Sequence, residues 1–137
     1  MATQIFVNLP VKELDKSIAF FKKLGYTFNE QFTDDTAACL VISESIYAML
    51  LTEAKFKGFL PAGKAMSDAT KSTEVLLALS CDSKEKVHEI VNTAIIAGAT
   101  EARPPEDHGF MFARSFNDLD GHVWEIFWMD PAGISQQ

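Results

Sequence analysis

Residues 11–25 read VKELDKSIAFFKKLG, and this stretch sets the pattern for the whole chain. Its apolar side chains recur at helical spacing, at Leu14, Ile18, Phe21 and Leu24. Such spacing predicts a helix with one apolar face. Gly25 stands where this helix should end, because glycine adopts the left-handed cap conformation at little cost. Residues 11–25 therefore predict one glycine-capped helix.

The segments on either side of this helix are typical of strands. Residues 5–9 precede it and end at Pro10, which a strand end tolerates. Three short runs rich in β-forming residues follow it, at 26–33, 37–43 and 46–52. Polar residues separate these runs, as in tight turns. Residues from about 4 to 56 therefore predict a βαβββ module.

The second half of the chain repeats this order. Residues 75–79 predict a strand, and Asp82 with Glu85 resembles a capping box at the start of a helix. That helix should end at Gly98, which lies 73 residues after Gly25. Further strands are expected near 100–103, 110–116 and 122–128. The chain is thus expected to be an α+β protein with two tandem βαβββ modules.

These modules fit into one domain of residues 1–137, with the second module at about 72–130. Residues 57–71 would then join them. The wider stretch 53–72 contains Gly58, Pro61 and Gly63, and two interpretations of it stay open. It is either a plain linker or a partly ordered loop over a pocket.

Composition narrows the functional classes. The chain has 137 residues, 47% hydrophobic and 23% charged, as expected for one globular domain. Its net charge of −7 argues against a nucleic-acid partner, which needs a dense positive surface. Neither a membrane span nor a secretory signal is evident, so a cytoplasmic location is expected. Cys39 and Cys81 lie in apolar runs and are expected to be buried thiols rather than a disulfide.

Two motifs resemble a known family. Residues 11–21, followed by Leu24-Gly25, resemble the first-helix motif of the vicinal-oxygen-chelate superfamily, which includes glyoxalase I, bleomycin-resistance proteins and extradiol dioxygenases. Residues 118–126, DLDGHVWEI, resemble the turn and final strand of the same superfamily. The likeness is greatest to uncharacterised proteins labelled as predicted lactoylglutathione-lyase relatives. It implies a cupped, eight-stranded mixed sheet with a ligand pocket inside, and commonly a homodimer.

In metal-using members of this superfamily, four ligands come from the first and fourth strands of each module. The resemblance places Phe6, Leu50, Leu76 and Glu125 at these positions. Only Glu125 has a side chain that binds metal ions, and a catalytic metal normally takes at least three protein ligands. We therefore expect no catalytic metal and no other cofactor.

The three histidines leave one alternative open. His122 lies three residues before Glu125, so on a strand their side chains should point to opposite faces. His108 follows Asp107 in a turn and is a looser candidate ligand. A divalent metal held through His108 or His122 thus remains an alternative, whereas His88 is expected on the helix surface.

Glu125 is the candidate catalytic residue. Strand alternation should place it on one side with Val123 and Phe127, and the tryptophans 124 and 128 on the other. In apolar surroundings its carboxylate becomes a better proton acceptor and could act as a general acid or base. Alternatively, a donor such as Asn8 or Arg114 holds it, because buried charges are usually paired.

The expected function is the binding of a small organic molecule in the sheet cavity, without a catalytic metal, as in bleomycin-resistance proteins. The residues expected to line the site are Phe6, Asn8, Leu50, Leu76, Arg114 and Phe127. The alternative is an enzyme that uses Glu125, either lactoylglutathione-lyase-like, with a divalent metal, or an isomerase. A module that serves only protein assembly is a third class, which no motif supports.

Overall fold

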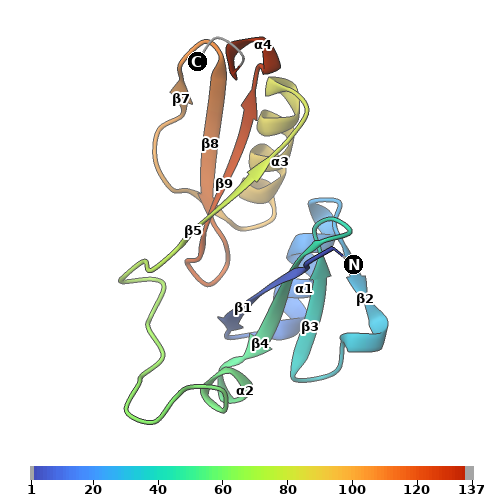
Figure 1. The fold of residues 1–137 in the computed structure, drawn as a ribbon. Coiled ribbons are helices and arrows are strands. Elements are labelled where there is room, and N and C mark those ends of the chain that lie inside the picture. The colour runs from blue at the N-terminus through green and yellow to red at the C-terminus, as the bar shows by residue number, and fades with distance from the viewer. Residues whose placement is uncertain (1, 135–137) are drawn as a thin grey trace. The chain divides into compact units, whose positions relative to one another are not determined.

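The computed structural model describes residues 2–134 and divides between Asp68 and Ala69 into two compact units (Figure 1). Each unit contains one mixed β-sheet and one longer helix, so the chain is of the α+β class, as predicted. Within residues 2–134, no helix has the length and apolar character needed to cross a membrane.

The first unit has the predicted order of strand, helix and three strands. Its sheet runs β1-β4-β3-β2, with β1 parallel to β4 and the other pairs antiparallel. The elements are β1 (Ile5–Val11), α1 (Leu14–Lys23), β2 (Thr27–Asn29), the 3-10 helix η1 (Glu30–Phe32), β3 (Ala37–Val41), β4 (Ile46–Thr52) and α2 (Glu53–Lys57).

Helix α1 forms where residues 11–25 predict it. Leu14, Phe20 and Phe21 are buried on its apolar face. Gly25 follows the helix with a φ of 100°, which explains why glycine stands there. The helix and the glycine that follows it therefore lie where residues 11–25 predict them.

The second unit repeats this arrangement. Its sheet runs β5-β9-β8-β6, and β7 also pairs with β8. Strands β5 and β9 are parallel, whereas the other pairs are antiparallel. The elements are β5 (Leu76–Ser80), α3 (Lys84–Ile96), β6 (Thr100–Glu101), β7 (Glu106–Asp107), β8 (Met111–Asn117), β9 (Val123–Met129) and α4 (Pro131–Ile134).

The start of α3 differs from the prediction. Ser83, not Asp82, is the N-cap residue, and its hydroxyl accepts a hydrogen bond from the backbone N–H of Lys86. Serine and aspartate are both good N-caps, so sequence alone does not choose between adjacent ones. The end of the helix agrees with the prediction, since Gly98 follows it with a φ of 117°.

Three other elements depart from the expected pattern. The run at 26–33 forms only a short strand, because the Asn29 side chain accepts from the N–H of Gln31 and caps η1. Within residues 2–134, one sheet has four strands and the other has five, whereas eight strands in total were expected. The additional strand is the short β7, which pairs with β8. The stretch 53–72 begins with helix α2.

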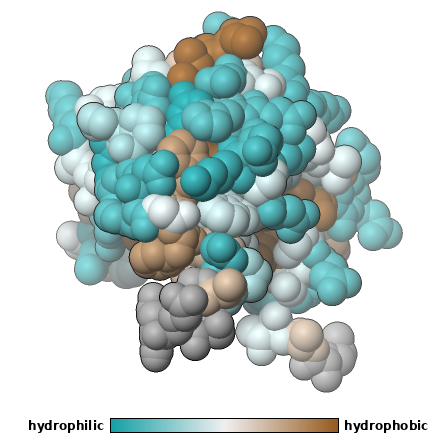
Figure 2. Space-filling view, turned by 90° about the horizontal axis from the view of Figure 1, so that it is seen from above, coloured by the Kyte–Doolittle hydropathy of each residue, from teal (hydrophilic) through white to brown (hydrophobic). Residues whose placement is uncertain are grey.

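The surface in Figure 2 agrees with the charged composition. Hydrophilic residues cover most of the face shown, and hydrophobic residues form small separate groups. The buried core of each unit lies between its helix and its sheet. Leu9, Leu40 and Leu50 belong to the first core, and Phe116 and Ile126 to the second.

Candidate functional site

The two faces of the second sheet differ sharply. Helix α3 covers one face, where Trp124 and Ile126 are buried and where His88 and Asn92 of the helix contact Arg114. Trp128 belongs to the same face, because the ammonium of Lys84 at the start of α3 lies 5.5 Å from its ring centroid. Strand alternation therefore turns Glu125 to the opposite face, which we call the distal face.

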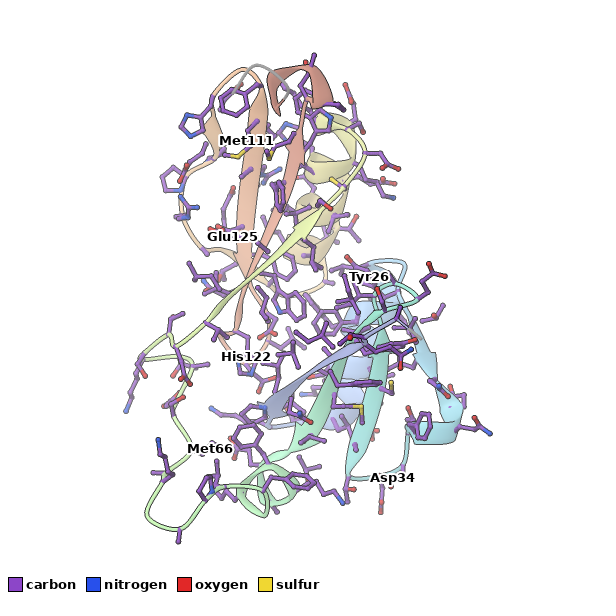
Figure 3. All side chains as sticks on the ribbon, viewed as in Figure 1. Tyr26, Asp34, Met66, Met111, His122 and Glu125 are labelled. Atoms are coloured by element: carbon purple, nitrogen blue, oxygen red, sulfur yellow. The ribbon has the colours of Figure 1, made fainter. Side chains whose placement is uncertain are left out.

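The distal face of the second sheet is formed by alternate residues of three neighbouring strands. They are Leu76 and Ala78 of β5, Val123, Glu125 and Phe127 of β9, and Met111, Ala113 and Ser115 of β8. Three predicted site residues, Leu76, Phe127 and Glu125, thus share one face. Figure 3 labels Glu125 among the side chains of this unit.

Glu125 is paired with Arg103, a residue that was not among the predicted site residues. The guanidinium donates to Oε1 of Glu125 from Nη2 at 2.5 Å and from Nε at 3.2 Å. The Glu125 side chain is only 18% exposed, whereas that of Arg103 is 45% exposed, so this charge-assisted pair lies at the edge of the solvent. The expectation of apolar surroundings for Glu125 is therefore wrong.

Further charged groups extend this pair. Nη1 of Arg103 contacts Oε1 of Glu106 on β7, and Nε2 of His108 lies 3.2 Å from Oε2 of Glu106. His108, the looser candidate metal ligand, is therefore linked to Glu125 through Glu106 and Arg103. Two carboxylates share one guanidinium in this chain of contacts, which leaves the group net negative when His108 is neutral.

The sheet topology explains how Arg103 reaches Glu125. Arg103 follows β6, whereas Glu125 lies on β9, and β8 runs between those strands. The Arg103 side chain must therefore cross β8 on the distal face, where β8 carries the small residues Ala113 and Ser115. Small side chains at alternate positions of a strand leave room for a long side chain to cross it. In the sequence, Ala113 and Ser115 could have indicated this arrangement.

Arg114 lies on the wrong face for the predicted role. It is 8% exposed and points toward α3, where it donates to both carboxylate oxygens of Glu101, to His88 Nδ1 and to Asn92 Oδ1. Its backbone neighbour Ser115 faces the distal side, because successive strand residues alternate. Arg114 is therefore a core residue of the second unit and does not hold Glu125.

The first sheet brings together only part of the predicted set. Phe6 and Asn8 share one face of β1, and the Phe6 ring stacks on Tyr47 with a centroid distance of 4.6 Å. Leu50 pairs in register with Leu9 and lies on the other face, where it is fully buried. The expectation that Leu50 shares a face with Phe6 is wrong, because one residue of register reverses the face. Asn8, the other proposed partner of Glu125, donates instead to the Phe6 carbonyl.

The side chains present do not fit a divalent metal. Across residues 2–134, no group of three or more His, Cys, Asp and Glu side chains is arranged to hold one. Phe6, Leu50 and Leu76 have no donor atoms in their side chains, and Oε1 of Glu125 already accepts from Arg103.

The turn before β9 is held by Asp118, which is 8% exposed. Its carboxylate accepts from the backbone N–H groups of Asp120 and His122 and from Nε1 of Trp124. Burial raises the pKa of Asp118, whereas the charge of His122 and these hydrogen bonds oppose the rise. The 118–126 motif therefore has a structural role, since Asp118 fixes the turn that leads into β9.

Comparisons with known proteins agree with this architecture. Residues 3–43 match the family model of the bleomycin resistance protein-like N-terminal domain. The chain is similar to a hypothetical protein, SA1046, from S. aureus, at 26% identity and a TM-score of 0.76 over 93% of this chain and 95% of that one. The chain therefore has the glyoxalase/bleomycin-resistance-like fold that the resemblance implies.

Two more distant structures show the same fold. A glyoxalase/bleomycin resistance protein/dioxygenase family enzyme from Burkholderia phytofirmans has 22% identity and a TM-score of 0.77, covering 93% of this chain and 99% of that one. The fosfomycin resistance protein FosX from Listeria monocytogenes has 16% identity and a TM-score of 0.66, covering 96% and 97%. No curated protein matches the chain.

Proposed function

We propose that the chain is a member of the vicinal-oxygen-chelate superfamily that binds a small organic molecule on the distal face of its second sheet, without a catalytic metal. The observation that carries the proposal is the Glu125–Arg103 pair, which places a mostly buried carboxylate, held by a guanidinium, on a face that α3 does not cover. A few fixed polar groups among apolar side chains such as Leu76 and Phe127 are typical of small-molecule sites.

The names of the structural neighbours do not choose between binding and a reaction, because some name a resistance protein and others an enzyme. Their names include bleomycin resistance and fosfomycin resistance, both directed at small organic molecules. Fold alone does not fix chemistry, so the charged groups of this chain must decide its ligand. The homodimer and the cytoplasmic location implied above stay predictions.

A screen of melting temperatures tests the proposal. We expect at least one compound from a set of cationic and aromatic metabolites to raise the melting temperature by about 9 °C at 100 times its Kd, because ligands stabilise the state they bind. Glu125→Gln should reduce this rise, because it removes one charge from the distal face.

Glu89→Gln is the matched control for this screen. It also removes one negative charge, but Glu89 is exposed on α3, where it pairs with Lys86. This variant should keep the full response. A flat response to the whole set, or an equal response in Glu125→Gln, contradicts the proposed function.

The second candidate is an enzyme, either lactoylglutathione-lyase-like or an isomerase, in which Glu125 moves a proton. The His108–Glu106 contact favours it, because an imidazole beside a carboxylate is a common acid–base pair. Metal analysis separates the two candidates. Stoichiometric nickel, zinc, manganese or iron, lost together with turnover in Glu125→Gln, would replace the metal-free proposal with this one.

A further inference from the structure

Ser115 carries a buried hydroxyl that the fold leaves unpaired. Its side chain lies at the middle of β8 and is 2% exposed, and its Oγ has no hydrogen-bond partner among the atoms of residues 2–134. Buried polar groups in proteins are nearly always hydrogen-bonded, so a hydroxyl kept here without a partner calls for a functional explanation.

The sheet register places this hydroxyl beside Glu125. Ser115 and Glu125 are direct cross-strand partners of β8 and β9, so their side chains stand next to each other on the distal face. Both hydrogen bonds from Arg103 end on Oε1 of Glu125. The second carboxylate oxygen, Oε2, and the Ser115 hydroxyl are therefore two adjacent acceptors, and an incoming group reaches the buried hydroxyl by displacing the side chains that cover it.

The charges around these acceptors select the kind of group. Arg103 directs three of its nitrogen atoms at Glu125 and Glu106, so its guanidinium is already committed to two carboxylates. An incoming anion would meet both carboxylates and is disfavoured. A cation with several N–H donors would instead neutralise the excess negative charge and satisfy both acceptors.

We propose that the ligand bound on the distal face presents a protonated amine to Glu125 and Ser115. The inference rests on the proposed function and names the chemical class of the ligand. One N–H of the ammonium group donates to Oε2 of Glu125 and a second donates to Oγ of Ser115. Arg103 stays paired with Glu106 and Oε1 of Glu125, and so holds the carboxylate in place for the amine.

Three probes of similar shape test the charge preference. Benzylammonium, benzyl alcohol and benzoate are titrated separately into the full chain at neutral pH, and affinity is measured by calorimetry or by NMR. We expect benzylammonium to bind about tenfold more tightly than benzyl alcohol, because a hydrogen bond to a charged group is the stronger kind. Benzoate should bind more weakly than either.

Ser115→Ala tests the role of the hydroxyl. The variant should weaken benzylammonium binding by about three- to tenfold, the effect of one lost hydrogen bond. Its melting temperature should not fall, because the hydroxyl has no partner in the fold to lose. Ser67→Ala, which removes an exposed hydroxyl from the segment after α2, should leave binding unchanged.

The outcomes separate this inference from the function on which it rests. If benzyl alcohol or benzoate binds the distal face as tightly as benzylammonium, the amine inference is overturned and small-molecule binding stands. Unchanged benzylammonium affinity in Ser115→Ala also overturns it. If no probe binds and no compound in the melting screen stabilises the chain, the inference and the proposed function fail together.

Discussion

Replacing Asp118 with alanine is expected to lower the free energy of unfolding by about 2–4 kcal/mol, because it removes the buried carboxylate that accepts three hydrogen bonds. Nε1 of Trp124 lies in the core and loses its acceptor at 2.9 Å. The N–H groups of Asp120 and His122 lose theirs as well. Urea denaturation followed by tryptophan fluorescence measures the change.

Asp107→Ala is the matched control. Asp107 is the exposed last residue of β7, and its side chain accepts from the backbone N–H of Gly109. Its loss should cost below about 1 kcal/mol. Equal effects of the two substitutions would mean that Asp118 does not organise the turn before β9.

The raised pKa of Asp118 adds a pH dependence to this prediction. The folded-state pKa lies above the ordinary value of 3.8, so the proton is bound more tightly in the folded chain than in the unfolded one. The stability that this proton contributes is present below pH 3.8 and is lost as the pH rises through the folded-state pKa. Asp118→Asn cannot ionise, and its stability should change less over that range.

The second large effect is expected at Arg114. Arg114→Ala should lower the free energy of unfolding by about 2–3 kcal/mol, because Arg114 is buried and its loss removes packing under α3 together with hydrogen bonds to His88 and Asn92. The substitution leaves Glu101 without its guanidinium and opens a space between α3 and β8. Chemical denaturation measures the loss.

Arg103→Ala gives the comparison for the same residue type. The Arg103 side chain is 45% exposed, so its removal should cost about 1 kcal/mol or less. Arg114→Ala, in turn, should leave ligand affinity within about twofold, because the Arg114 side chain points to the face under α3, away from Glu125. A strong loss of ligand binding in a folded Arg114→Ala protein would restore Arg114 to the site.

The elements that sequence predicted well are those with local signals. Apolar spacing and Gly25 located α1, and the same signals with Gly98 located the end of α3. Strand β4 lies at Ile46–Thr52, the same residues as the predicted run. Alternation along β9 also placed Glu125 opposite Trp124, because a strand has only two faces.

The contacts that sequence missed are those between distant residues. Arg103 and Glu125 are 22 residues apart in the chain. They meet because β6, which precedes Arg103, and β9, which carries Glu125, flank the same strand, β8. The face of Leu50 depended on the pairing of β1 with β4, which sequence does not give. Arg114 and Ser115 are adjacent in the chain, and only the position of α3 decides which of them points to the distal face.

The central claim is that the distal face of the second sheet is the ligand site, and methyl NMR tests it directly. Ala78 and Ala113 carry methyl groups on this face, whereas those of Leu79 and Ile126 lie on the face under α3. Adding the compound with the largest rise in melting temperature should shift the two alanine methyl signals and leave the other two nearly unchanged. Shifts confined to Leu79 and Ile126, or absent from all four, would contradict it.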